Sequence, residues 1–109
     1  MEQEEDFDEP KWTTECINIR PGHAWHKYAG TIAYITHCSF AVPNNLSNDE
    51  YCAILTADTW DESTVLCKLM PSDVSKKMKI VLCASQTFYL SNKGNRTMTV
   101  SMLTKRTIQ

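Results

Sequence analysis

Apolar and polar residues alternate along most of the chain, most clearly over 97–103. In that segment the apolar residues Met98, Val100 and Met102 take turns with threonine and serine. Successive side chains of a strand point to opposite faces, so the pattern predicts a strand with one buried face and one solvated face. Five further runs, rich in β-branched and aromatic residues, also predict strands: 13–19, 28–42, 51–57, 63–70 and 78–90.

Turn-forming residues separate these runs. Pro21-Gly22 ends the first predicted strand, and polar connections are expected over 43–50 and 58–62. The segment 91–95 predicts a hairpin turn in which Gly94 takes a positive φ, because glycine has no side chain to oppose it. The residues therefore predict an all-β barrel or sandwich.

One short helix is predicted, over 71–77. Pro71 is followed by Ser72 and Asp73, and either of these can cap a helix N-terminus. The helix would lie between the third and fourth of five core strands, which is the layout of the OB-fold barrel. We therefore expect a five-stranded OB-fold barrel with that helix and an extra N-terminal strand. The chain has 109 residues, so 11–109 is expected to be a single domain.

Charge is distributed unevenly along the chain, although the net charge is only −2. Acidic residues crowd 1–10, which is expected to be a disordered tail because such a run cannot bury itself. No acidic residue follows Asp73, whereas seven lysines and arginines do. Two interpretations of this distribution remain open. In the first, the acidic tail and the basic segment after Asp73 only keep the protein soluble. In the second, the basic segment binds a polyanion and the tail competes for the same face.

The five cysteines are odd in number and irregularly spaced. The first twenty residues carry acids where a signal peptide carries a basic and then an apolar segment, so secretion is not expected. Reduced thiols in the cytosol or nucleus, packed as small apolar residues, fit this pattern better than a disulfide framework. No apolar run approaches the roughly 18 residues of a spanning helix, so no membrane insertion is expected.

Several segments resemble a known family of single-strand-binding domains. The run 29–35 resembles the opening strand of eukaryotic OB domains, 53–59 with 63–69 resembles their second and third strands, and 79–84 resembles the fourth. The chain looks most like the small single-OB subunits of the replication protein A and CST telomere complexes. It departs from them at Trp60, where the family has a glycine. The resemblance implies a nuclear domain that binds single-stranded DNA and docks on a larger OB-fold protein.

OB domains bind single strands with aromatic rings that stack on bases and with cations that contact phosphates. The candidates for stacking are Tyr34, Trp60, Phe88 and Tyr89. The candidates for phosphate contact are Lys68, Lys93, Arg96, Lys105 and Arg106. Asp61 and Glu62 beside Trp60 would repel phosphate, which favours a protein contact or a cap over the barrel end for that tryptophan.

Metal and catalytic motifs are missing from the sequence. His23 and His26 are closely spaced, but structural zinc sites use paired ligands such as CxxC, and the sequence has no CxxC. The segment 23–26 is therefore expected to be a loop with Trp25 as its anchor. The sequence has no nucleophile elbow, P-loop or dinucleotide motif. We therefore expect no enzyme activity, no metal and no cofactor.

Two functions remain from the sequence. The first is a single-stranded DNA-binding OB module, or a small OB subunit of a replication or telomere complex. The alternative is a protein-interaction adaptor, a viral or regulatory β-domain that does not contact nucleic acid.

Overall fold

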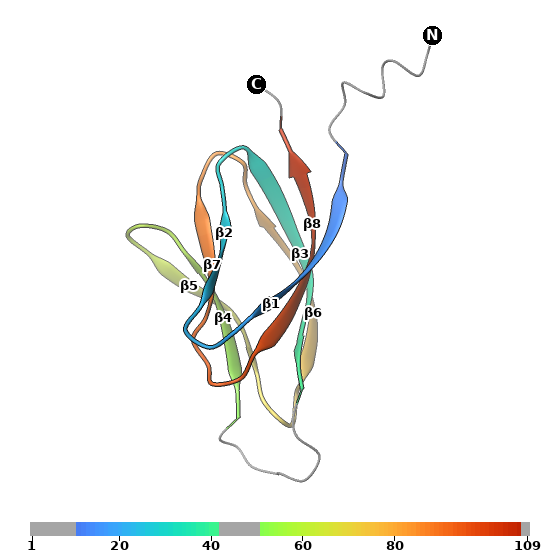
Figure 1. The fold of residues 1–109 in the computed structure, drawn as a ribbon, viewed down its shortest axis with the longest axis vertical. Helices are drawn as coiled ribbons and strands as arrows, with labels where there is room; N and C mark the ends of the chain where they lie inside the picture. The colour runs from blue at the N-terminus through green and yellow to red at the C-terminus, as the bar shows by residue number, and fades with distance from the viewer. Residues whose placement is uncertain (1–10, 42–50, 108–109) are drawn as a thin grey trace.

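The computed structural model describes residues 11–41 and 51–107, which form two stacked β-sheets (Figure 1). The predicted acidic tail at 1–10 and the polar connection at 43–50 lie outside the described residues. The strands in chain order are β1 (Thr13–Ile19), β2 (Ala24–Lys27), β3 (Thr31–Phe40), β4 (Ala53–Asp58), β5 (Ser63–Leu69), β6 (Ser75–Leu82), β7 (Phe88–Asn92) and β8 (Met98–Arg106).

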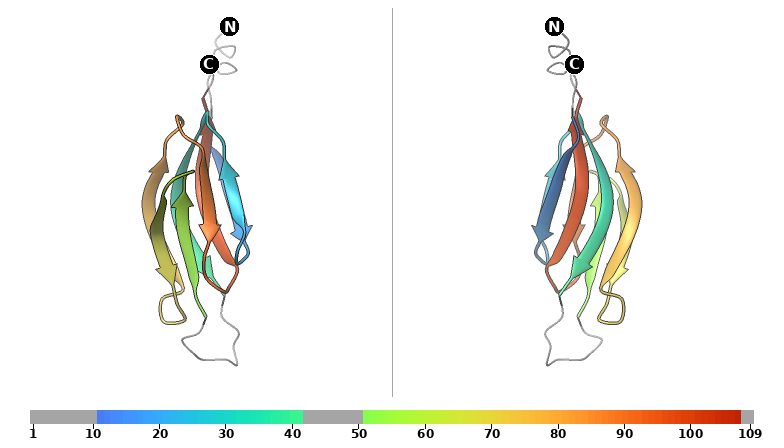
Figure 2. Two further views of the ribbon diagram at one scale, coloured as in Figure 1. Left: turned by 90° about the vertical axis from the view of Figure 1, so that its left-hand side faces the viewer. Right: turned by 90° about the vertical axis from the view of Figure 1, so that its right-hand side faces the viewer.

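Each sheet has four antiparallel strands. The first sheet, here called sheet A, has the order β1-β8-β3-β6, and the second, sheet B, has the order β2-β7-β4-β5. Figure 2 shows the two sheets face to face. The chain passes from one sheet to the other at most of its connections, as it does in a double-sheet jelly roll. The prediction of an all-β fold is confirmed.

The prediction of a closed OB-fold barrel with a helix is wrong. The described strands form two separate sheets, and no helix occurs in residues 11–41 and 51–107. The expected hairpin between the predicted strands at 78–90 and 97–103 is missing, because β7 pairs with β2 and β4 while β8 pairs with β1 and β3. The strands expected on either side of 58–62 do pair, as β4 and β5. The last two strands therefore lie in different sheets.

The core lies between the inner faces of the two sheets. Strand β8 contributes Met98, Val100 and Met102, which are all buried, as its alternation predicted. Strand β3 contributes Ala33 and Ile35 before a bulge shifts its register. Sheet B faces them with residues such as Leu55, Leu69 and Leu90. Burial of these apolar side chains is the main stabilising contribution to the fold.

The predicted helix over 71–77 is a turn followed by a strand. Met70 and Asp73 exchange two backbone hydrogen bonds, of 3.1 and 2.8 Å, and β6 begins at Ser75. From Met78 onward every second residue faces the core, ending at the buried Leu82. This apolar alternation outweighs the capping signal of Ser72, because a strand here buries a row of side chains and one helical turn would not.

The single strand predicted over 78–90 is two strands. β6 ends at Leu82, and a turn over 83–87 carries the chain from sheet A to β7 of sheet B. Similarly, 23–26 is not a loop: it forms most of β2, whose Trp25 packs against the core.

Gly94 lies in a connection between the sheets and not in a hairpin turn. The described residues with positive φ are Gly22 and Gly30, so Gly94 is not chosen for a left-handed backbone. A Cβ on Gly94 would lie 2.6 Å from the Cα of Ala53 and would also collide with the Cys52 carbonyl. Glycine is required there because two backbones approach closely.

Candidate functional site

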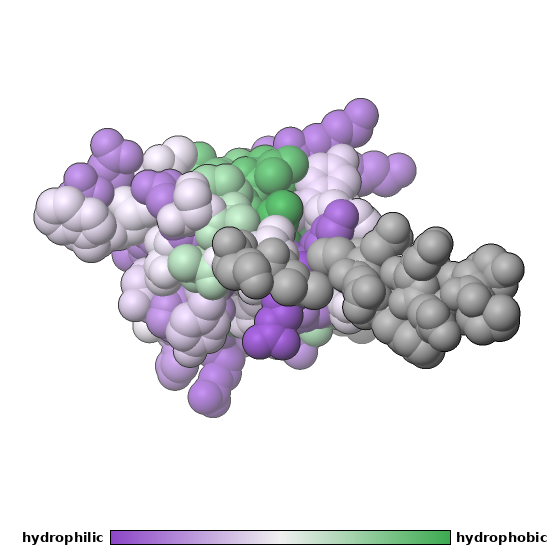
Figure 3. Space-filling model, turned by 90° about the horizontal axis from the view of Figure 1, so that it is seen from above, coloured by the Kyte–Doolittle hydropathy of each residue, from purple (hydrophilic) through white to green (hydrophobic). Residues whose placement is uncertain are grey.

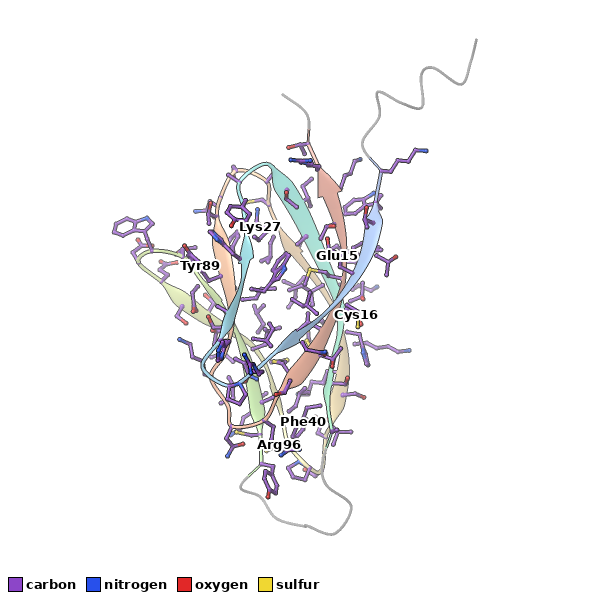
Figure 4. All side chains as sticks on the ribbon, in the orientation of Figure 1. Glu15, Cys16, Lys27, Phe40, Tyr89 and Arg96 are labelled. Atoms are coloured by element: carbon purple, nitrogen blue, oxygen red, sulfur yellow. The ribbon has the colours of Figure 1, made fainter. Side chains whose placement is uncertain are left out.

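The residues predicted to bind nucleic acid are spread over several faces of the sandwich. Tyr34 on β3 and Lys105 on β8 belong to sheet A, and Lys68 is exposed on β5 of sheet B. Tyr89 and Arg96 lie well apart along the long axis of the molecule (Figure 4). The expected groove of rings and cations is therefore not assembled in one place.

Phe88 and Arg96 are both engaged by other parts of the chain. Phe88 packs against the core, with the Lys27 Nζ 5.7 Å from its ring centre. The Arg96 guanidinium lies 5.1 Å from the centre of the Tyr51 ring and donates a hydrogen bond of 3.3 Å to the Ala41 carbonyl. It lines a cleft of about 560 Å³ together with Phe40 (Figure 4).

Three rings form a row on the outer face of sheet B. The His26 ring stacks on the Tyr89 ring, with centroids 4.4 Å apart, and lies 3.9 Å from the Tyr28 ring. His26 and Tyr89 are direct cross-strand partners, a pairing in which aromatic side chains stabilise a sheet. This contact fixes the orientation of Tyr89 on the surface.

Trp60 projects from the tight connection between β4 and β5. Its side chain is 93% exposed, an unusual placement for a large aromatic residue. The Thr59 N–H donates to the Glu62 carbonyl at 2.8 Å, and the Thr59 hydroxyl donates to Asp61 at 3.1 Å. The turn is therefore held by its own hydrogen bonds while Trp60 remains accessible. Clefts of about 410 and 340 Å³ both include Trp60 in their walls.

Asp58 connects this turn to the middle of sheet B. Its carboxylate accepts hydrogen bonds from Ser63 (2.6 Å) and Ser91 (2.7 Å), and the Lys93 ammonium lies 3.6 Å away. Burial by itself would raise the pKa of Asp58, but the two hydroxyl donors and the lysine charge outweigh it and hold the pKa below its usual 3.8. Lys93, a predicted phosphate contact, is thus paired with a carboxylate.

Acid is expected to weaken the fold through Asp58. A carboxyl with a lowered pKa contributes stability that is present above pH 3.8 and is lost as the pH falls through the lowered value. We expect Asp58→Asn to flatten the fall in unfolding free energy below pH 3.8, measured by urea denaturation at a series of pH values. Asp61→Asn, on an exposed carboxylate of the same turn, is the control and should leave the fall unchanged. If the free energy of unfolding falls with pH as steeply in Asp58→Asn as in wild type, the role of Asp58 is contradicted.

The outer face of sheet A carries an apolar band. Tyr34 is the cross-strand partner of both Leu103 and Val81, so three apolar side chains adjoin across β8, β3 and β6. Trp12 extends the band, with its ring over Lys105 at 5.5 Å. Figure 3, looking at the end of the sandwich where the termini leave, shows apolar surface gathered in one area with hydrophilic residues around it.

No group of three or more histidine, cysteine or acidic side chains that could hold a metal occurs among the described residues. Within the same residues no helix is long and apolar enough to cross a membrane.

Sequence comparison does not identify a family, since no family model and no curated protein matches the chain. Solved structures do match its fold. The Drosophila NLP core, whose crystal structure is reported for its insight into pentamer formation and histone binding, shares 7% identity over 84% of this chain and 97% of that chain, with a TM-score of 0.64. The nucleoplasmin-like N-terminal domain of Drosophila FKBP39 shares 9% identity over 90% of this chain and 92% of that chain, with a TM-score of 0.65.

These likenesses show that the chain shares the β-sandwich fold of these two domains, and they correct the resemblance to OB-fold subunits. The single-stranded DNA, replication and telomere assignments are wrong with it, as is the expected OB-fold partner. OB domains bind strands across one curved sheet of a partly open barrel, and here the same residues are divided between two sheets. Neither likeness points to a catalytic domain, in line with the expectation of no enzyme activity.

Sequence reasoning named Trp60 and Tyr89, as stacking candidates for nucleic acid, but did not place His26 and Tyr28 with them. The signal was present: Trp25 and Lys27 alternate with His26 and Tyr28, which is the period of a strand. The spacing of His23 and His26 directed attention to metal binding and hid this alternation.

Proposed function

We propose that the chain is a nuclear protein-interaction domain that associates with copies of itself and binds a basic protein such as a histone. The observation that carries this proposal is the shared fold with the NLP core, a domain reported to form pentamers and to bind histones. It develops the protein-interaction alternative from the sequence. Two features of this chain support it independently of the likeness.

The first feature is the apolar band on sheet A. Val81 is 62% exposed on β6, the edge strand of sheet A, and it lies in one cross-strand row with Tyr34 and Leu103. Contiguous exposed apolar surface marks contact sites between proteins, because removing it from water is favourable by about 25 cal/mol per Å². A second copy of the chain is the partner that we propose for this face.

The second feature is acidic charge suited to a basic partner. Six of the thirteen acidic residues stand in the first nine positions, and Asp61 and Glu62 directly follow the exposed Trp60. Assembly of several copies would bring several such segments together and raise the local negative potential. Electrostatic attraction of this kind speeds association and weakens as salt is added.

The proposal is tested by measuring the mass of the full chain in solution by light scattering and its binding to purified core histones. We expect a mass above that of one chain at micromolar concentration, and histone binding that weakens with salt. Val81→Lys should reduce assembly, whereas Val65→Lys is the matched control, because Val65 is 64% exposed on sheet B. A single-chain mass together with no histone binding at low salt would overturn the proposal.

A further inference from the structure

Trp60 and Tyr89 line the same cleft on the surface of the sandwich. The cleft has a volume of about 410 Å³, and the two aromatic residues reach it from the β4–β5 turn and from β7. Its remaining walls are polar and uncharged: Thr59, Ser85, Gln86 and Thr87. The cleft therefore offers two rings and several hydrogen-bonding groups, with no cation in its walls.

The Tyr89 ring and the backbone that carries Trp60 are both held in place. Tyr89 stacks on His26, its partner across β2 and β7. Trp60 sits on a turn closed by the hydrogen bond between Thr59 and Glu62. A ring and a turn that are fixed before a ligand arrives lower the ordering cost of binding. The exposure of Trp60 also leaves its ring free to be covered by a partner.

Negative charge lies on the other side of the same tryptophan. Trp60, Thr59 and Gln86 also line the second cleft, of about 340 Å³, which includes Asp61 and Glu62 in its walls. Asp58 is already paired with Lys93, so the carboxylates available to a ligand here are those of Asp61 and Glu62. A ligand at Trp60 meets aromatic faces on one side and carboxylates on the other.

We propose that this surface, formed by Trp60, Tyr89, Asp61 and Glu62, docks an arginine side chain of the basic partner. A guanidinium is planar, stacks on aromatic rings and donates two parallel hydrogen bonds to a carboxylate. A lysine ammonium can be attracted by the rings and the acids, but it has no planar face to stack on a ring and no pair of parallel N–H donors for a carboxylate. Phosphate groups are repelled by the two acids. This inference rests on the proposed function and names the chemistry by which the partner is recognised.

The test uses the full chain and two synthetic peptides of equal length and charge, one rich in arginine and one rich in lysine. Binding is measured by calorimetry. Burial of Trp60 is followed by the part of the tryptophan fluorescence change that Trp60→Phe removes, because the chain also has Trp12 and Trp25. We expect the arginine peptide to bind more tightly, and Trp60→Ala to weaken its binding about ten-fold. Trp60→Phe should keep most of the affinity, because phenylalanine retains an aromatic face.

Control variants separate the cleft from general effects on the surface. Tyr89→Ala should weaken binding, whereas Tyr28→Ala, an exposed tyrosine of the same row outside the cleft walls, should not. Asp61→Asn with Glu62→Gln should reduce both the affinity and the preference for arginine. Thermal melting of each variant confirms that it is folded.

The outcomes distinguish the cleft from the wider proposal. If Trp60→Ala and Tyr89→Ala bind core histones and the arginine peptide as wild type does, the proposal that the cleft docks arginine is overturned while the proposed function stands. Equal affinity for the two peptides would also overturn it. If the wild-type chain binds neither histones nor the arginine peptide, the histone-binding part of the proposed function and the arginine-docking proposal fail together.

Discussion

Asn92→Asp is expected to lower the free energy of unfolding by about 4 kcal/mol, because it leaves buried carbonyls without a donor. Asn92 is 0% exposed, at the end of β7. Its Nδ2 donates to the carbonyls of Ile19 (2.9 Å) and Arg96 (2.7 Å). Its Oδ1 accepts from the backbone N–H groups of Gly94 (3.0 Å) and Ile54 (3.4 Å). The aspartate would place a carboxylate oxygen against the two carbonyls, which repel it.

Urea denaturation at pH 7 measures this effect. Asn95→Asp is the matched control, since it makes the same chemical change three residues away on an exposed side chain. Its Oδ1 already accepts a hydrogen bond from the Cys52 N–H (2.8 Å), a role that a carboxylate oxygen can keep. We expect a change below about 1 kcal/mol for this control. A similar small loss for Asn92→Asp would show that the amide does not hold the two sheets together.

Lys27→Met is expected to lower the free energy of unfolding by about 3 kcal/mol at pH 7. The lysine is 1% exposed and points between the sheets from the end of β2 (Figure 4). Its ammonium donates to three backbone carbonyls: those of Tyr28 (3.1 Å), Thr31 (2.6 Å) and Cys83 (2.7 Å). Methionine has a similar shape and no donor, so these carbonyls lose their partner. Lys68→Met, on an exposed lysine of β5, is the control and should change stability little.

The pH dependence provides a second readout for Lys27. Burial lowers the pKa of Lys27 below its usual 10.5, so the unfolded chain binds this proton more tightly than the folded chain does. Stability from this group therefore rises as the pH increases through the lowered pKa towards 10.5. Lys27→Met lacks that rise, so the stability difference between wild type and variant should widen with pH. A difference that narrows over this range would contradict a buried, charged lysine.

Most of the strands could be predicted from the sequence, but most of their partners could not. The predicted strand 13–19 is β1, and the alternation of Met98, Val100 and Met102 fixes the buried face of β8. The same alternation suits a barrel or a sandwich, since it reports two faces of one strand and not which strand lies beside it. The predicted hairpin at 91–95 failed for this reason, as its two flanking strands belong to different sheets.

The candidate site was partly accessible to sequence reasoning. Trp60 stood out because a tryptophan between acids in a polar turn has no core to join, and its exposure agrees with that argument. The contact of Tyr89 with His26 could not be foreseen, because 63 positions separate them and only the β2–β7 register brings their rings together. Lys27 was equally hidden, since one of the carbonyls that bind its ammonium belongs to Cys83, 56 positions further along the chain.

By itself the sequence determined an all-β fold and the inward face of strands such as β8, together with an exposed tryptophan among acids. These are local properties, set by the alternation of side chains and by turn chemistry within a few residues. The tertiary structure alone decided that the strands form two sheets, that Tyr89 meets Trp60 across one cleft, and that Asn92 and Lys27 lie buried. Such features depend on contacts between residues far apart in the chain, where packing and the pairing of backbone groups select one arrangement among several that suit the same local pattern.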